Sequence, residues 1–418
     1  MEKFVVEGGN VLKGEIEVGS SKNSVLPLLS ACLLCDGDVT LKGVSPILDA
    51  LNMLALLKEM KCEHYFNCGN LTINTDGAMP KTIDGEMAKS IRSSIFLLGS
   101  MLSRFKEVKM SYPGGCDIGK RPIDLHIEAL EKMGATFTFD DEYLYCKASK
   151  LKGANITLKF ESVGATENIM LAGVKADGVT IIENPAKEPE IVDLQDFLVS
   201  MGAKIKGAGT RRIEIEGVKR LKGVTFSPIP DRIEAGTFLV AGAILGEKLE
   251  ICKCKVQHLY SLIDKLVKST CKIGVFSDKI IINRGKNPRG MGIIETRPYP
   301  FFPTDMQSQL LAISTVCDGN TVFKENIFEN RFNQIEYLKE MGADIVTVGN
   351  IASVQGVKYL TGKKVKANDL RGGVSLVLAG LIARGETTIE DARHILRGYY
   401  KLEEKLRGVG SKISFIKE

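Results

Sequence analysis

The stretch Leu130-Glu-Lys-Met-Gly-Ala135 returns five more times along this chain in recognisable form. The other copies are Leu57-Lys-Glu-Met-Lys-Cys62, Leu198-Val-Ser-Met-Gly-Ala203, Leu266-Val-Lys-Ser-Thr-Cys271, Leu338-Lys-Glu-Met-Gly-Ala343 and Leu406-Arg-Gly-Val-Gly-Ser411. Successive leading leucines are 73, 68, 68, 72 and 68 residues apart. A fixed period of this kind indicates one supersecondary unit that is copied and packed against itself.

Each copy is expected to end an amphipathic helix. Apolar residues recur at helical spacing after Pro189 and after Pro122, and glycine in the fifth position suits a left-handed helix cap. Alternating strand patterns such as 212–216 follow, and then a helix that is apolar nearly all round, as in 238–245. Six units of about 70 residues account for the chain, and two domains of three repeats each are the simplest division.

Composition limits the classes of function. The net charge is +5, with 56 basic and 51 acidic residues well mixed, which is too balanced for a nucleic-acid coat. The N-terminal residues have no signal-peptide layout and no apolar run is long enough to span a bilayer, so a cytoplasmic protein without a membrane partner is expected. The ten cysteines lack metal-site spacing and read mostly as small buried hydrophobes. No metal and no cofactor are expected.

Charged residues occupy one phase of the repeat, at the expected starts of the buried helices. These are Lys22 with Asn23, Arg92, Asp231, Asp305 and Arg371, and Ser162-Val-Gly164 takes the same phase. The outer helices start near Arg121, Arg331 and Arg397, and the other three repeats have Asp49, Glu190 and His258 near that place. An acid at a helix start is ordinarily an N-cap, whereas lysine or arginine there opposes the helix dipole. Several cations at the unfavourable end therefore indicate a bound anion in one interdomain cleft.

The segment Ser111-Tyr-Pro-Gly-Gly-Cys-Asp-Ile-Gly-Lys-Arg121 lies outside any apolar periodicity. Cys116 follows two glycines and precedes two cations, which predicts a reactive thiol on a loop able to fold over a ligand. The alternative is a surface loop with an incidental cysteine. His126 is interpreted as a hydrogen-bonding helix residue.

These motifs together resemble the UDP-N-acetylglucosamine enolpyruvyl transferases, along the whole chain. The resemblance is carried by Lys22-Asn23, Pro113-Gly-Gly-Cys116, Arg121-Pro-Ile-Asp-Leu-His126, Ser162-Val-Gly-Ala-Thr166, Glu188-Pro-Glu-Ile-Val-Asp193, Pro230-Asp-Arg-Ile-Glu234, Phe302-Pro-Thr-Asp-Met-Gln307, Phe328-Glu-Asn-Arg-Phe332, Asp369-Leu-Arg371 and His394-Ile-Leu-Arg-Gly398. It implies an α/β fold of two inside-out α/β barrel domains with three repeats each. Residues 22–229 would form one domain, and 1–21 plus 230–418 the other, with the active site between them.

The resemblance also implies the reaction, which is transfer of the enolpyruvyl group of phosphoenolpyruvate to the 3′-hydroxyl of UDP-N-acetylglucosamine with release of phosphate. Cys116 would be the general acid and Asp305 the base, and Lys22 and Arg397 would complete the catalytic set. The residues expected to bind phosphoenolpyruvate are Lys22, Asn23, Arg121, Arg331, Arg371 and Arg397. Those expected to bind the nucleotide sugar are Asn23, Arg92, Arg121, Pro122, Ile123, Asp124, Leu125, Ser162, Val163, Gly164, Asp305 and Ile327.

Two departures from the relatives' pattern and two alternatives accompany this reading. Phe160-Glu161 stands where some relatives have a basic residue, and Gly372-Gly373 is expected to loosen a helix start. One alternative is the sister enzyme acting on shikimate 3-phosphate, whose relatives typically carry Lys-Ser in place of Lys22-Asn23. The other is a non-catalytic nucleotide-sugar sensor, which would need neither acid nor base.

Overall fold

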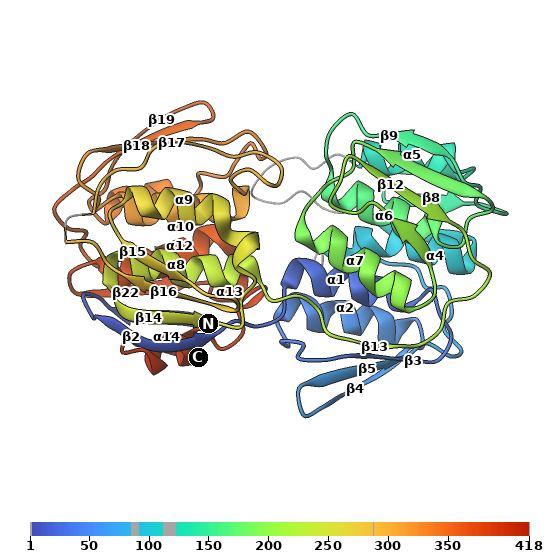
Figure 1. The fold of residues 1–418 in the computed structure, drawn as a ribbon, viewed down its shortest axis with the longest axis horizontal. Coiled ribbons are helices and arrows are strands. Elements are labelled where there is room, and N and C mark those ends of the chain that lie inside the picture. Colours follow the sequence, from blue (N-terminus) through green and yellow to red (C-terminus); the bar gives the residue numbers. More distant parts are fainter. Residues whose placement is uncertain (1, 85–91, 112–122, 287, 418) are drawn as a thin grey trace. The chain divides into compact units, whose positions relative to one another are not determined.

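The structure is a computed structural model that describes residues 2–84, 92–111, 123–286 and 288–417. The described residues divide into two compact units. The terminal unit comprises residues 2–19 and 230–417, so it contains both ends of the chain (Figure 1). The middle unit comprises described residues between 20 and 229. Each unit is described by itself.

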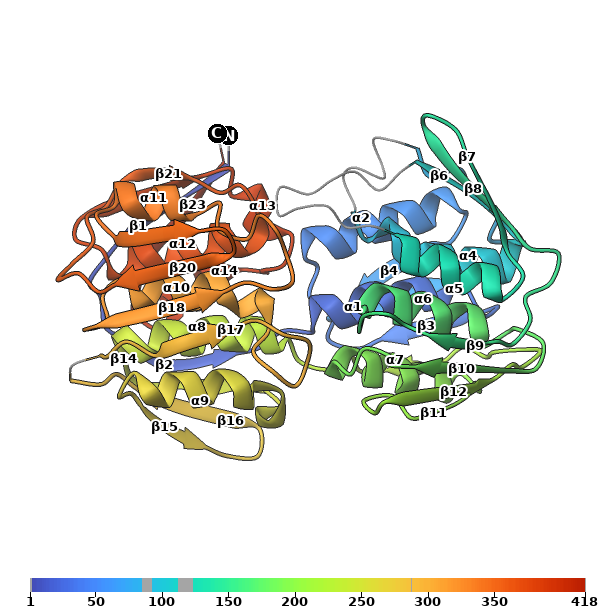
Figure 2. The ribbon, with the colours of Figure 1, turned by 90° about the horizontal axis from the view of Figure 1, so that it is seen from above.

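The terminal unit has three inner helices, and each of them packs against strands of its own repeat. They are α8 (Arg232–Leu245), α10 (Gln307–Ser314) and α12 (Leu370–Ile382). α10 packs on both α8 and α12, and nearly all residues of the three helices are buried. Strands lie outside these helices in both views (Figures 1 and 2). The outer helices and short turns are α9 (Tyr260–Lys268), α11 (Ile335–Glu340), α13 (Arg393–Leu396), α14 (Leu402–Gly408), η2 (Val256–Leu259) and η3 (Thr304–Met306).

Three four-stranded sheets cover the terminal unit, in the orders β15-β16-β14-β2, β17-β18-β20-β19 and β21-β22-β1-β23. The N-terminal strand pairs with strands from the C-terminal repeat on both sides, for example Phe4 with Ile389 and with Phe415. The strands are β1 (Glu2–Glu7), β2 (Leu12–Glu17), β14 (Gly246–Cys252), β15 (Lys272–Val275), β16 (Lys279–Asn283), β17 (Gly292–Glu295), β18 (Asn320–Lys324), β19 (Asp344–Val348), β20 (Ile351–Gln355), β21 (Lys364–Lys366), β22 (Glu386–Glu390) and β23 (Lys412–Lys417).

The middle unit repeats this plan. Its inner helices are α1 (Lys22–Cys32), α4 (Leu97–Phe105) and α6 (Val163–Gly173), and its outer helices are α2 (Leu48–Glu59), α5 (Asp124–Lys132) and α7 (Pro189–Ser200). Its sheets have the orders β13-β3-β5-β4, β6-β8-β7 and β11-β12-β10-β9. The remaining elements are η1 (Arg92–Phe96), β3 (Asp38–Leu41), β4 (Glu63–Asn67), β5 (Asn70–Asn74), β6 (Glu107–Ser111), β7 (Thr136–Phe139), β8 (Tyr143–Lys147), β9 (Asn155–Thr157), β10 (Val179–Glu183), β11 (Lys204–Lys206), β12 (Arg212–Glu216) and β13 (Thr225–Phe226).

The six copies of the sequence motif share one backbone conformation. Its fifth residue has positive φ in all six copies, whether it is glycine, as at Gly134 (φ 93°), or Lys61 (φ 65°) or Thr270 (φ 72°). In five copies the sixth residue donates its backbone N–H to the carbonyl of the leading leucine, as Ala135 does to Leu130 at 3.0 Å. This six-to-one bond is the Schellman arrangement that ends a helix. All six leucines are buried, so the motif both ends the outer helix and anchors it to the core.

The inner helices α6, α10 and α12 are each flanked by two parallel strands, whereas β2 before α1 pairs with β14 and β13 before α8 pairs with β3. The short strand before the helix pairs in parallel with the strand after it, as β9 does with β10, β17 with β18 and β21 with β22. Parallel neighbours need a crossover connection, and here the inner helix supplies it. The expected α/β fold built from repeats is therefore confirmed, with the apolar helices inside and the sheets outside.

Candidate active site

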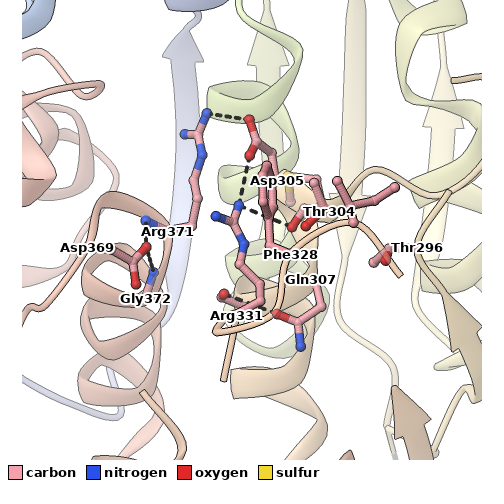
Figure 3. A network of polar contacts seen from close by, with 12 residues as sticks. Thr296, Thr304, Asp305, Gln307, Phe328, Arg331, Asp369, Arg371 and Gly372 are labelled. Carbon is pink, nitrogen blue, oxygen red and sulfur yellow. Dashed lines mark hydrogen bonds and ion pairs between the residues drawn. The ribbon is translucent and has the colours of Figure 1, made fainter. Parts of the chain in front are cut away.

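The clearest constellation in the terminal unit is an acid held between two arginines (Figure 3). Asp305 lies in η3, directly before α10, and each of its carboxylate oxygens accepts one hydrogen bond. Oδ1 accepts from Nη2 of Arg331 at 2.8 Å, and Oδ2 accepts from Nη2 of Arg371 at 2.9 Å. The side chains of Arg331 and Arg371 are only 2% and 6% exposed, whereas that of Asp305 is 25% exposed. Two almost fully buried guanidinium groups thus share one partly exposed carboxylate.

The electrostatics of Asp305 follow from this geometry. Burial alone would raise the pKa of Asp305, but the charges of Arg371 and Arg331 outweigh burial and hold that pKa well below its usual range. The carboxylate does not cap a helix, since neither η3 nor α10 has a side-chain cap. Asp231, by contrast, caps α8 by accepting the N–H groups of Ile233 and Glu234 at 2.8 and 2.9 Å. The simple N-cap reading therefore holds for Asp231 and is wrong for Asp305.

Glu325 holds the two segments that carry Asp305 and Arg331. Its Oε1 accepts from the Thr296 hydroxyl at 2.9 Å and from the backbone N–H groups of Ile327 and Phe328 at 2.8 and 3.1 Å. Its Oε2 accepts from the Thr304 hydroxyl at 3.0 Å. A buried carboxylate with four donors is well satisfied, so it can fix the loop after β18 against the turn before α10.

The N-terminal ends of α8, α10 and α12 gather around this cluster. The Tyr399 hydroxyl lies 2.7 Å from the hydroxyl of Thr237 in α8. Gln309 in α10 donates to the Asp305 carbonyl at 2.8 Å and to the Thr237 hydroxyl at 3.4 Å. Arg371 lies in the first turn of α12, which Asp369 caps. Helix N-termini present free N–H groups and positive dipole ends, so this arrangement favours an anion near the arginines.

In the middle unit the structure places Lys22 at the first position of α1, where its ammonium pairs with Asp49 of α2 at 2.7 Å. Asp49 is fully buried and the Lys22 side chain is 12% exposed. Asn23 follows Lys22 and is half-buried. A lysine at the start of a helix opposes the helix dipole, and Asp49 offsets part of that cost.

The two segments expected to contact the nucleotide sugar lie side by side in the middle unit. His126, in the first turn of α5, accepts at Nδ1 from the Asn168 amide of α6 at 3.0 Å. Gly164 packs so closely on the His126 ring that an added Cβ would lie 3.1 Å from Cε1. Burial lowers the pKa of His126 to about 4, so the ring is neutral at pH 7 and is a hydrogen-bonding helix residue, as expected. Ile123, Asp124 and Leu125 therefore adjoin Ser162, Val163 and Gly164, where Ser162 caps α6.

The remaining expected residues are distributed between the two units. Arg92 begins η1 in the middle unit, while Ile327 and Arg397 are half-buried in the terminal unit. Cys116, Arg121 and Pro122 lie outside the described residues. The structure thus groups Asp305, Arg331 and Arg371 in one unit. The convergence of both groups on a single cleft stays a prediction.

Most cysteines of the described ranges are buried, as the sequence predicts. Of the nine within the described ranges, seven are buried, Cys252 is half-buried and Cys68 is exposed, and all nine are free. Burial raises the pKa of Cys62 to about 11 and of Cys146 to about 12, so these thiols are weakly reactive. Among the described residues, no group of three or more potential ligands could hold a metal ion. In the same residues no helix is long and apolar enough to cross a membrane.

Comparison with known proteins places this architecture and site in a family. The family model for EPSP synthase (3-phosphoshikimate 1-carboxyvinyltransferase) matches residues 6–406. Two proteins of Caldanaerobacter subterraneus subsp. tengcongensis, UDP-N-acetylglucosamine 1-carboxyvinyltransferases 1 and 2, are 48% and 45% identical over 413 residues. These matches cover 98% and 99% of this chain and 99% of each relative. The chain belongs to the EPSP synthase-like enolpyruvyl transferase family. The crystal structure of the enolpyruvyl transferase NikO from Streptomyces tendae shares the fold, with a TM-score of 0.90, 22% identity, and coverage of 100% of this chain and 99% of that one.

Three features of this enolpyruvyl transferase were not foreseen from the sequence. Glu325 and the pairing of Asp49 with Lys22 are the first two, although Asp49 stands at the repeat phase where other repeats have arginine. The third corrects an expectation, because Gly372 and Gly373 do not loosen the start of α12. Asp369 accepts the N–H groups of both Arg371 and Gly372, and a Cβ on Gly373 would lie 2.8 Å from Ile395. These glycines permit close packing.

The segment before α6, where some relatives have a basic residue, carries an ion pair. Glu161 pairs with Lys187, and Phe160 beside it is exposed. The charges of Glu161 and Lys187 offset each other, so the pair adds no net positive charge to this segment.

Proposed function

We propose that this enolpyruvyl transferase moves the enolpyruvyl group of phosphoenolpyruvate to the 3′-hydroxyl of UDP-N-acetylglucosamine and releases phosphate. The observation that carries the proposal is the sequence identity of 43–48%, along the full chain, with curated UDP-N-acetylglucosamine 1-carboxyvinyltransferases. This reaction is the first committed step of peptidoglycan synthesis, and we place the enzyme in the cytoplasm, where both substrates are made.

The residues divide into three tasks under this proposal. Lys22, Arg121 and Arg397 bind and neutralise the phosphate of phosphoenolpyruvate, and the buried guanidiniums of Arg331 and Arg371 suit its carboxylate. The nucleotide sugar is bound by the neighbouring starts of α5 and α6, together with Asn23, Arg92 and Ile327. Cys116 donates a proton and Asp305 accepts one.

The bond changes balance with one acid and one base. The sugar 3′-oxygen bonds to C2 of phosphoenolpyruvate while its proton passes to Asp305, and Cys116 gives a proton to C3. The product of this addition is a tetrahedral ketal that still carries phosphate. C3 then returns a proton to the Cys116 thiolate while the C2–oxygen bond to phosphate breaks and the double bond returns. The departing phosphate takes the proton that Asp305 holds, so both side chains regain their starting states. The arginines and helix N-termini stabilise the negative charge that develops during both steps.

The test is a turnover assay that measures phosphate released from phosphoenolpyruvate with each acceptor in turn. Release with UDP-N-acetylglucosamine and none with shikimate 3-phosphate is the expected result. Release only with shikimate 3-phosphate would instead show 3-phosphoshikimate 1-carboxyvinyltransferase activity, after which the family model is named. Binding of the nucleotide sugar without any phosphate release would instead indicate a non-catalytic sensor.

A further inference from the structure

The paired state of Asp305 conflicts with its proposed task. A base must accept a proton, yet each oxygen of Asp305 already accepts a guanidinium N–H group, at 2.8 and 2.9 Å, and these charge-assisted bonds make the remaining lone pairs less basic. The same two arginines hold the pKa of Asp305 well below its usual range against the effect of burial. In the arrangement of Figure 3, Asp305 is therefore a weak proton acceptor. Loosening at least one of these pairs would make Asp305 a stronger acceptor for the proton of the sugar hydroxyl.

Several cations surround the carboxylate of Asp305. Arg331 and Arg371 contribute two buried guanidinium groups, and the charge of Arg232 at the start of α8 also acts on Asp305. Within the described part of the chain, Nε of Arg331 is buried and has no hydrogen-bond acceptor. An unsatisfied buried donor on a cation favours an anionic acceptor at this place.

The other acids around the cluster are committed elsewhere. Asp231 and Asp369 accept backbone N–H groups of α8 and α12, and Glu325 accepts two hydroxyls and two backbone N–H groups. The phenol of Tyr399, whose ring lies 6.0 Å from the Arg371 guanidinium carbon, is bonded to Thr237. The unsatisfied Nε of Arg331 thus favours a further acceptor supplied by a ligand. A carboxylate fits best, because it can accept two parallel guanidinium N–H bonds.

We propose that Asp305 is a gated base, which the carboxylate of phosphoenolpyruvate releases by taking its place on Arg331 and Arg371. This inference rests on the proposed function. One carboxylate replaces another on the same donors, so the charge-assisted bonds of the arginines are preserved during the exchange. Asp305 is the more exposed member of the cluster and can turn toward the acceptor. Away from the arginines its pKa returns toward about 3.9, the ordinary value for aspartate. The hydroxyl is thus activated only when phosphoenolpyruvate is present.

The test compares two non-reactive ligands that differ only in the carboxylate. Phospholactate retains the carboxylate and phosphate of phosphoenolpyruvate, and isopropyl phosphate has a methyl group in place of the carboxylate. Both are titrated calorimetrically into the full-length enzyme saturated with UDP-N-acetylglucosamine. The variants are Asp305→Asn, which removes the competing charge, and Asp231→Asn, a matched control that removes a nearby charge whose carboxylate caps α8.

Exchange predicts that Asp305→Asn binds phospholactate roughly ten-fold more tightly than the wild type, because the ligand no longer has to displace a charged acceptor. Isopropyl phosphate should tighten far less, and Asp231→Asn should change both ligands alike. If Asp305→Asn changes the affinity for both ligands by the same factor, or weakens the binding of phospholactate, the exchange is refuted.

An infrared difference spectrum of the wild type gives a second measurement, which does not depend on whether Asp305→Asn folds. Phospholactate should shift the carboxylate stretch assigned to Asp305, and isopropyl phosphate should not. The same shift with both ligands, or with neither, also overturns the exchange. If the wild type releases no phosphate from phosphoenolpyruvate with any acceptor, the proposed function itself has failed, which is a separate result.

Discussion

Replacing Asp305 with alanine, beside the same replacement of Asp231, separates a base from a helix cap. The two acids stand at the same phase of successive repeats, but their contacts differ. Asp231 accepts two backbone N–H groups of α8, and Asp305 accepts two guanidinium N–H groups. Any kinetic difference between the two variants therefore reflects the role of the carboxylate, not its position in the repeat.

The stability effects are expected to be similar in size. Loss of an N-cap costs about 0.5–2 kcal/mol, which is the expectation for Asp231→Ala. Breaking a buried ion pair costs about 3–5 kcal/mol, but Asp305 is 25% exposed and water will screen the arginines, so about 1–3 kcal/mol is expected for Asp305→Ala. Urea unfolding measures both values. Stability alone will not separate the two variants.

Turnover is expected to separate them. Asp305→Ala should lower kcat by roughly 10²–10⁴-fold, the usual contribution of a positioned proton acceptor, while UDP-N-acetylglucosamine binding persists. Asp231→Ala should keep a kcat close to that of the wild type. The assay is phosphate release at saturating concentrations of both substrates. If Asp305→Ala turns over near the wild-type rate, Asp305 is not the base, and a large loss in Asp231→Ala would make Asp231 the next candidate.

Three further outcomes are expected. Treatment with the epoxide fosfomycin should give one adduct, on the peptide with Cys116, and modification of exposed Cys68 in the same mass-spectrometric map would show that the reaction is unselective. Burial, then the charges of Glu190 and Glu188, raises the pKa of Glu167, so the folded chain binds an extra proton above about pH 4.3. Glu167→Gln should gain stability over the wild type in urea unfolding as the pH rises from 4.5 to 8, and a difference independent of pH would refute this. Gly373→Ala should cost about 1–3 kcal/mol in the same assay because its Cβ would meet Ile395 at 2.8 Å, and an unchanged midpoint would show that the helix start can shift.

The sequence was sufficient for the repeats because their information is local. Helix ends depend on backbone conformation within a few residues, and the fifth position of the motif has positive φ even where Lys61 or Thr270 replaces glycine. The starts of the inner helices could be predicted equally well, because Lys22 is the first residue of α1, Ser162 caps α6 and Arg371 is the second residue of α12.

The partners of these residues could not be predicted from the sequence in the same way. Glu325 binds groups 2, 3, 21 and 29 residues away, so its role depends on packing between the strand β18 and the turn before α10. No periodicity in the chain marks such a residue, because it lies at a loop and not on a helix face. Local sequence patterns do not determine how the two units are placed relative to each other. The expected convergence of Lys22 with Arg397 depends on that placement.

The repeat phase nevertheless explains the signs of the charges in the cluster. An inner-helix start and the following outer-helix start are 27 residues apart for Lys22 and Asp49, and 26 apart for Asp305 and Arg331. Both pairs have opposite signs, and both form ion pairs in the structure. Arg371 and Arg397 stand 26 residues apart at the same phase but have the same sign, so they cannot neutralise each other. Arg371 reaches instead to Asp305 of the preceding repeat, which already serves Arg331. One acid thus pairs with arginines of two repeats, and an anionic substrate that bound these arginines would add a second negative charge beside them.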